Sequence, residues 1–299
     1  MAKRVLITGC SGLIGRELCK QLSDMGYYTV GVDNESRFKD FAPSCLDAYY
    51  QLDIEEFVKK IPNNFDYIYH YAAINGTKSF YSNPTKVLIN NTNVDLTMFS
   101  YASSNKRKSC KFIYASSSEV VSGTTNYPTS EELDLYIKDV TNPRWSYRLP
   151  KVMTENLLFN SDINFVIFRY FNVYSEHSGK GHFVKDIIDK IKNQDFNLIS
   201  PDETRSFCYV QDAVSATIQC AEMVDNDIIN IGSDEEITVQ TATKILSNAL
   251  GYQGDWNEVP SMQGSTKRRR PNLQKLKKYI PNYTPEKFLT VIEKIKDKL

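Results

Sequence analysis

A tyrosine and a lysine, Tyr147 and Lys151, stand four residues apart and could act together on a proton. On a helix, side chains at positions i and i+4 project from the same face, so the Lys151 ammonium can lie beneath the Tyr147 hydroxyl. A free tyrosine has a pKa of about 10, and a neighbouring positive charge lowers that pKa because it stabilises the phenolate. The pair therefore predicts Tyr147 as a general base near neutral pH.

The Tyr-x-x-x-Lys spacing is weak evidence by itself, because the chain contains 19 tyrosines and such a match arises readily by chance. Pro150 lies within the spacing, and proline is tolerated in the first turn of a helix but disrupts its interior. The helix that carries the pair is therefore expected to begin at about Ser146 or Tyr147. The prediction depends on the elements that position this helix.

The N-terminus has the pattern of a strand, a glycine turn and a helix. Residues 4–8 form a short apolar run, the glycines follow at once, and the next apolar residues recur at helical spacing. In such a turn the first glycine allows the sharp bend, the second lets the backbone approach a pyrophosphate, and the third lets the helix pack on the strand. The positive helix end then holds the phosphates. We therefore expect a dinucleotide to contact Gly9, Gly12, Ile14 and Gly15.

An acid ends the second predicted strand. Asp33 follows the run 28–32, at about the 20-residue distance from the turn that a ribose acceptor takes in this arrangement. A carboxylate there accepts hydrogen bonds from the adenosine ribose 2′-hydroxyl and repels a 2′-phosphate. The predicted cofactor is therefore NAD rather than NADP, with Asn34 beside Asp33 in the same site.

The third predicted strand, 48–52, ends at Asp53 and Ile54. An acid at this edge can meet the adenine amino group, so both residues are placed in the cofactor site. The alternative, that Asp53 caps the helix that follows, has equal weight.

The fourth predicted strand, 65–71, runs into Ala72 and Ala73, whose small side chains let a ribose lie against the backbone. A helix predicted over 84–103 carries Asn91, which we also place at the cofactor. The chain continues to alternate between strands and helices, which indicates a parallel sheet.

Three serines and a glutamate, residues 116–119, follow the predicted strand 111–114. The carboxyl edge of a parallel sheet is where doubly wound folds bind ligands. These hydroxyls and the Glu119 carboxylate are therefore candidates for contact with a substrate.

The overall composition excludes several classes of protein. Lys plus Arg (36) balance Asp plus Glu (36), so no global field favours nucleic acid or an anionic membrane. The six cysteines have no metal-ligand spacing, no signal peptide precedes the first strand, and no run of about 18 apolar residues exists. We expect a cytoplasmic protein with reduced thiols, no metal, no nucleic-acid partner and no membrane contact.

Taken together, the motifs resemble those of the extended short-chain dehydrogenase/reductase family, and within it the NAD-dependent nucleotide-sugar epimerases and dehydratases. The resemblance covers essentially the whole chain, in family order and spacing. It is carried by Gly9-x-x-Gly12-x-x-Gly15, Asp33, His70-Tyr71-Ala72-Ala73, Ser116-Ser117-Ser118-Glu119-Val120, Tyr147-x-x-x-Lys151, Arg169-Tyr170-Phe171-Asn172 and Thr204-Arg205-Ser206-Phe207.

The fold expected from the alternation and the resemblance is α/β, a Rossmann-type doubly wound parallel sheet with a smaller C-terminal α/β substrate domain. The expected division is an NAD-binding Rossmann domain over 1–171, with a later return segment near 206–230, and a mainly nucleotide-sugar-binding domain over 172–299. The active site is expected in the cleft between the two parts.

The resemblance also implies a reaction. Tyr147, held as the phenolate by Lys151 and the nicotinamide charge, would take the proton of the sugar 4-hydroxyl while a hydride passes from C4 to NAD. Ser117 would hydrogen-bond the same oxygen, and Lys151 would also hold the nicotinamide ribose. The resulting 4-keto sugar would then be reduced on its other face to a 4-epimer or dehydrated. A 6-carboxylate would instead be lost as CO₂, as in the UDP-glucuronate decarboxylases.

Glu119 bears on that choice, because the dehydratases and decarboxylases of the family have a glutamate at this position. The prediction is that Glu119 serves a later step at C5 or C6, and the alternative is that it structures the adjoining turn. One dehydratase subgroup has Asp before this Glu, whereas here Ser118 stands there. The family's usual Tyr-Gly after the valine is replaced by Val121-Ser122.

The remaining predicted contacts come from the resemblance. They are Tyr170 with the nicotinamide end, and Ser117, Ser118, Asn172, Arg205 and Arg269 with the nucleotide-diphosphate sugar. Arginine suits the diphosphate because its planar fork binds two oxygens at once.

A homodimer is expected from the resemblance, through the helix 84–103 and the helix after Tyr147. Val87, Leu88, Leu96 and Phe99 give the first helix apolar surface to bury, although they could equally face its own sheet. Two other functions stay open, a 4-ketoreductase that uses a released cofactor and a non-catalytic homologue that binds NAD.

Overall fold

A seven-stranded parallel sheet forms the centre of the computed structural model, which describes residues 2–37, 43–104, 110–137, 139–179 and 181–299. The strand order is β11-β6-β5-β4-β1-β2-β3, so the chain leaves β1 in one direction and returns on its other side at β4. The strands are β1 Arg4–Thr8, β2 Tyr28–Asp33, β3 Ala48–Gln51, β4 Tyr67–His70, β5 Lys111–Ser117, β6 Asn164–Tyr170 and β11 Asp227–Ile231. The predicted doubly wound Rossmann-type sheet is thereby confirmed.

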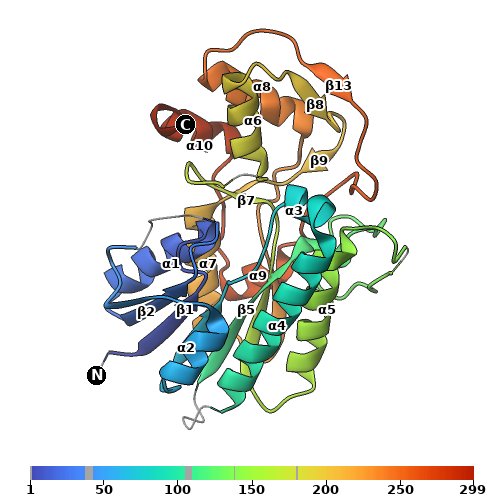
Figure 1. Ribbon diagram of the computed structural model, residues 1–299. Helices are drawn as coiled ribbons and strands as arrows, with labels where there is room; N and C mark the ends of the chain where they lie inside the picture. Colours follow the sequence, from blue (N-terminus) through green and yellow to red (C-terminus); the bar gives the residue numbers. More distant parts are fainter. Residues whose placement is uncertain (1, 38–42, 105–109, 138, 180) are drawn as a thin grey trace.

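Helices cover both faces of the sheet (Figure 1). Along β1, Val5 and Ile7 pack with α1 and α7, whereas Leu6 packs with α2, α4 and α5. Because successive residues of a strand face opposite sides, a strand covered on both faces is apolar throughout. The helices are α1 Leu13–Asp24, α2 Ile54–Lys60, α4 Pro84–Ser103, α5 Trp145–Phe159, α7 Val210–Met223 and, beside β11, α9 Gln274–Tyr279.

A smaller α/β part lies beyond one end of the sheet, where Figure 1 places α6, α8 and α10 together. Its short strands form three two-stranded sheets, β10 with β7, β12 with β9, and β13 with β8. Its elements are β7 Val173–Tyr174, α6 Phe183–Lys192, β8 Asn197–Ile199, β9 Thr204–Arg205, β10 Cys208–Tyr209, β12 Ile237–Thr238, α8 Val239–Ala249, β13 Asn257–Val259 and α10 Phe288–Ile295. One apolar core runs from β1 through α7 into α6, α8 and α10, so the two parts are packed together.

Several element boundaries differ from those predicted. The helix Pro84–Ser103 matches its prediction, whereas α5 begins at Trp145 rather than at Ser146 or Tyr147. Amides of residues 145 and 146 bond carbonyls three residues back, which closes a turn before Pro150 is reached. Pro150 therefore lies beyond the first turn of α5, inside the helix.

The C-terminal helix is also shorter than the predicted 285–299. The Glu286 amide donates to Asp212 Oδ2 (2.9 Å) and the Phe288 amide donates to Glu235 Oε2 (2.7 Å), so neighbouring carboxylates bind the chain before α10 begins. After α10 the chain ends in a 3₁₀ turn, Lys296–Lys298. The fourth strand likewise spans only Tyr67–His70 of the predicted 65–71.

All six cysteines are free thiols. Among the described residues, no helix is long and apolar enough to cross a bilayer, and no cluster of three or more His, Cys, Asp or Glu side chains is arranged around a possible metal ion.

A buried ion pair fastens α5 to β6, and its removal should destabilise the fold. Glu155 accepts from Arg169 at 2.6 and 2.9 Å, and each side chain is 4% exposed. Glu155→Ala leaves a buried guanidinium without its charge partner, so we expect unfolding free energy to fall by about 3–5 kcal/mol in urea titration. Asp24→Ala breaks the exposed pair with Lys20 and should leave the unfolding midpoint almost unchanged.

Candidate active site

A cavity of about 1330 Å³ lies at the carboxyl end of the sheet, between the sheet and the smaller part. It exceeds the roughly 300–1,000 Å³ of a site for one drug-sized ligand, and so has room for a dinucleotide and a second large ligand. All the predicted site residues except Asn91 line it: Gly9, Gly12, Ile14, Gly15, Asp33, Asn34, Asp53, Ile54, Ala72, Ala73, Ser117, Ser118, Glu119, Tyr147, Lys151, Tyr170, Asn172, Arg205 and Arg269.

The glycine turn joins β1 to α1 with almost no space for side chains. Gly9 has φ +69°, and a Cβ there would lie 2.7 Å from the Ala72 nitrogen. A Cβ on Gly15 would lie 2.2 Å from the Gly9 oxygen, so packing requires both glycines. Gly12 is the N-cap of α1 and leaves the backbone at the helix start bare, which suits a pyrophosphate. The turn therefore fits NAD.

The acid that ends β2 is held by two backbone amides. Asp33 Oδ2 accepts from the Ser11 amide at 3.0 Å and Oδ1 from the Glu35 amide at 2.7 Å. Burial raises the pKa of Asp33, and these two bonds oppose the rise. Its carboxylate lines the same cavity as the glycine turn, as a ribose acceptor must.

Asp53, for which an adenine contact and a helix cap had equal weight, lines the cavity together with Asn34. It occupies the N-cap position of α2, but its side chain makes no capping bond there. Instead Oδ1 accepts from Asn34 Nδ2 at 2.7 Å, which brings two of the predicted cofactor residues together.

Asn91 is not at the cavity surface. Its side chain is fully buried and clamps the loop after β4, because Oδ1 accepts from the Ile74 amide (2.8 Å) and Nδ2 donates to the Ile74 carbonyl (3.0 Å). The prediction of a direct cofactor contact is therefore replaced by a role in shaping the loop that lines the site.

Tyr147 is buried in the cavity wall, with its ring stacked on Phe80 at 4.8 Å. Lys151 Nζ lies 5.9 Å from the Tyr147 ring centre, but nearer to the ring of Tyr114 (4.5 Å) and to Asp95 Oδ2 (3.7 Å). Lys151 alone does not lower the pKa of Tyr147, and the contribution of the nicotinamide charge stays a prediction. Burial raises that pKa and the Glu119 charge raises it further, while a hydrogen bond with Ser117 opposes the rise.

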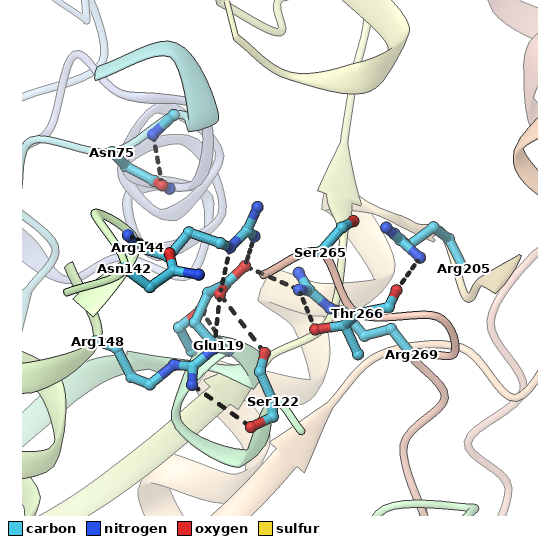
Figure 2. Close-up of polar contacts among 12 residues, drawn as sticks. Asn75, Glu119, Ser122, Asn142, Arg144, Arg148, Arg205, Ser265, Thr266 and Arg269 are labelled. Carbon is cyan, nitrogen blue, oxygen red and sulfur yellow. Dashed lines mark hydrogen bonds and ion pairs between the residues drawn. The ribbon is translucent and has the colours of Figure 1, made fainter. Parts of the chain in front are cut away.

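Glu119 lies at the centre of an arginine cluster that the sequence motifs did not predict (Figure 2). Its carboxylate is 7% exposed and accepts from Arg144 and, at 2.8 Å, from Arg269, while Arg148 Nη2 lies 3.6 Å away. Burial alone would raise the pKa of Glu119, but the arginine charges hold it well below its usual range. The carboxylate is therefore ionised. The i, i+4 spacing of Arg144 and Arg148 beside Tyr147 was the available sequence signal.

Arg205 and Arg269 lie on the side of the smaller part, and Figure 2 shows both near Thr266. Arg205 donates to Glu203 Oε2 (2.5 Å) and to the Thr266 carbonyl (2.9 Å). Burial lowers the pKa of Arg205 to about 10, and the positive charge of Arg269 lowers it too. Two partly buried guanidinium groups thus stand beside one another at the cavity.

Tyr170 is the last residue of β6, and Asn172 follows the strand at the same cavity. Asn172 has φ +41°, and its buried Nδ2 has no hydrogen-bond partner among the described residues. An unpaired buried donor is costly, so it favours a ligand with acceptor oxygens. The Tyr170 hydroxyl meets those of Tyr71 and Thr217, the latter at 2.8 Å.

A dinucleotide turn opens into one cavity with a tyrosine, a serine and a lysine, which is the arrangement expected of an NAD-dependent enzyme. The family model described as the NAD dependent epimerase/dehydratase family matches residues 5–232. The chain belongs to this family and is therefore an NAD-dependent enzyme.

Individual relatives agree with this assignment. The UDP-N-acetyl-alpha-D-glucosaminuronate decarboxylase of Bacillus cytotoxicus is 31% identical, over 97% of this chain and 96% of the relative. The fold matches that of UDP-glucuronic acid 4-epimerase from Bacillus cereus, with TM-score 0.84, 24% identity and coverage of 99% and 98% of the two chains. UDP-N-acetylglucosamine 4-epimerase from Methanobrevibacter ruminantium gives TM-score 0.83 at 23% identity, with the same coverage.

Replacement of the acid at the end of β2 should change the cofactor preference. Asp33→Ala removes the predicted ribose acceptor and the charge that repels a 2′-phosphate, so NAD should bind about tenfold more weakly while NADP binds more tightly. Titration calorimetry with each cofactor measures both changes. Asp24→Ala, at the exposed end of α1, is the control. Equal affinity of the unaltered protein for NAD and NADP would contradict the assignment.

Proposed function

We propose that the enzyme oxidises C4 of the sugar in a nucleotide-diphosphate sugar, with Tyr147 as base, and then rearranges the transient 4-keto sugar by epimerisation or dehydration. Bound NAD would supply the acceptor for the hydride from C4. The observation that carries this proposal is that Tyr147, Ser117 and Lys151 line one cavity with the glycine turn and the arginines.

The roles of the remaining residues follow from their positions. Ser117 would bond the substrate oxygen that Tyr147 deprotonates, since its hydroxyl already interacts with that phenol. Arg205, Arg269 and Asn172 would hold the diphosphate, because they place guanidinium and amide donors in the cavity. Burial of Tyr147 disfavours the phenolate, so a positive charge beside the ring is essential to the base, and Lys151 supplies one.

Loss of the Tyr147 hydroxyl should stop the first chemical step. Tyr147→Phe keeps the ring on Phe80 but removes the base, so C4 oxidation should slow by about 10²–10⁴-fold while NAD and nucleotide-sugar binding persist. Stopped-flow absorbance of the nicotinamide reports the step. Tyr127→Phe is the control, since its hydroxyl bonds the Thr124 carbonyl outside the cavity. An unchanged rate in Tyr147→Phe would remove Tyr147 from the mechanism.

A second candidate function, decarboxylation of a nucleotide-linked uronate, is favoured by the arginine cluster. Three guanidinium groups from Arg144, Arg148 and Arg269 face the single carboxylate of Glu119. The cluster therefore has a net positive charge, which would attract an anionic sugar. The relative at 31% identity is named as a decarboxylase of such a sugar. Once C4 is a ketone, the C5–C6 bond can break, so that CO₂ leaves, the electron pair of that bond forms the enolate, and a proton adds at C5. Return of the hydride to C4 would then give the pentose nucleotide.

Glu119 would take part in this later step, at C5 or C6. As an ionised carboxylate it can accept a proton only if the arginines turn from it toward the substrate. The alternative is that Glu119 structures the adjoining turn. One contact favours it, because the Ser122 hydroxyl donates to Glu119 Oε2 at 3.5 Å.

The uronate candidate predicts release of CO₂. Incubation with UDP-glucuronate or UDP-N-acetylglucosaminuronate should yield CO₂ and the corresponding pentose nucleotide, as measured by mass spectrometry. UDP-glucose and UDP-N-acetylglucosamine are the matched neutral controls. Conversion of the neutral sugars with no turnover of either uronate would eliminate this candidate in favour of epimerisation or dehydration.

We also propose a cytoplasmic homodimer built on α4 and α5, which pack side by side in Figure 1. Of the predicted contact residues, Val87 is buried against Phe80 and Tyr147, and Phe99 packs on its own sheet. Leu96 is 40% exposed, and Ile89 on the same face of α4 is 55% exposed. The apolar surface that remains for a partner is therefore centred on Ile89 and Leu96.

Charge on that surface should separate the subunits. The double variant Ile89→Asp/Leu96→Asp places two like charges in each half of the proposed interface, so it should sediment as a monomer at micromolar concentration while the unaltered protein sediments as a dimer. Leu289→Asp, 52% exposed on α10, is the matched control. A monomeric unaltered protein would refute the proposal.

A further inference from the structure

Asp95, on α4, is a buried carboxylate that lies behind Tyr147 and Lys151 of α5. The function proposed above gives it no role. Its side chain is 0% exposed and the Lys151 side chain is 3% exposed, and Lys151 Nζ lies 3.7 Å from Asp95 Oδ2. An isolated charge in such a position would be very costly, so the groups around Asp95 must determine its state.

The hydrogen bonds around one oxygen of Asp95 have a defined direction. The Thr8 hydroxyl accepts from the amides of Tyr71 (3.1 Å) and Ala72 (3.2 Å), so its own proton is directed to His70 Nδ1 at 2.7 Å. Burial lowers the pKa of His70, which keeps the ring neutral with its single proton on Nε2. That proton is donated to Asp95 Oδ1 at 3.0 Å.

The other oxygen, Oδ2, is surrounded by donors as well. It accepts from the hydroxyl of Tyr114 and from that of Thr154 at 3.1 Å, in addition to the nearby ammonium of Lys151. Burial alone would raise the pKa of Asp95, but Lys151 and these bonds lower it overall. Because every neighbouring polar group is a donor, Asp95 is an anion.

We propose that Asp95 is a positioning residue for the reaction, which keeps Lys151 protonated and anchored beside Tyr147 by a buried ion pair. The inference rests on the proposed role of Lys151. Burial lowers the pKa of Lys151, and Asp95 is the main group that opposes this effect. Without Asp95, the Lys151 ammonium would therefore lose its proton more easily.

The other titratable groups around Lys151 cannot replace Asp95. Glu155, one turn along α5, is already paired with Arg169 and bonded by Ser116. His70 is neutral, and Tyr114 and Tyr147 are buried phenols whose pKa values are raised by burial. Asp95 is therefore the available counter-charge among the described residues near Lys151.

The direct test is the titration of the Lys151 ammonium by NMR in ¹⁵N-lysine-labelled protein, without added nucleotide or substrate. Lys151→Met assigns the signal. Asp95→Asn removes the charge and should lower the titration midpoint of Lys151 by at least about one pH unit. Thr154→Val deletes a hydrogen bond to the same oxygen while keeping the charge, so its midpoint should match the unaltered protein.

Activity provides a second and separate measurement. Removal of a negative charge lowers the proton affinity of both Lys151 and Tyr147, so both limbs of the pH profile for C4 oxidation should move to lower pH in Asp95→Asn. An unchanged Lys151 midpoint in folded Asp95→Asn would overturn the proposal. If the amide prevents folding, Asp95→Thr supplies the same charge removal, with the same two outcomes. Since the titration needs no substrate, its result is independent of whether the proposed reaction is correct.

Discussion

Exclusion of water from charged groups is the constraint on which this site depends. Tyr147 is 6% exposed and Lys151 is 2% exposed, so neither the phenolate nor the ammonium is stabilised by solvent. In such surroundings each charge requires a partner, and the fold supplies Asp95 to Lys151, Arg169 to Glu155, and the arginine cluster to Glu119. The same desolvation strengthens every remaining electrostatic interaction with a substrate.

The two parts of the molecule contribute different halves of this arrangement. The sheet edge brings the glycine turn, Asp33, Ser117 and Tyr147 together, because the carboxyl ends of parallel strands meet there. The smaller part adds Arg205 and Arg269. Since one core continues through both parts, these two arginines are held in a fixed relation to the sheet.

Local sequence patterns predicted the sheet, the glycine turn and the helix Pro84–Ser103, because each is decided by residues close in the chain. Long-range polar contacts were not predictable in this way. Arg269 meets Glu119 although 150 positions separate them, and His70 meets Asp95 across 25 positions. The surroundings of Tyr147 were not predictable for the same reason, since helical spacing places Lys151 on the correct face but does not reveal that Asp95 attracts its ammonium or that burial disfavours the phenolate.

The transient ketone at C4 is the central claim, and isotope transfer tests it most directly. A panel of UDP-, GDP-, CDP- and dTDP-sugars, each with deuterium at C4, would be incubated with the enzyme and the products examined by mass spectrometry. If C4 is oxidised and then reduced within one bound complex, the product retains the deuterium, and mixtures of labelled and unlabelled substrate show no crossover between molecules. Rapid-quench samples would show whether deuterium passes from C4 to the nicotinamide during turnover. If product forms while no deuterium reaches the nicotinamide, C4 is not oxidised and the account is contradicted.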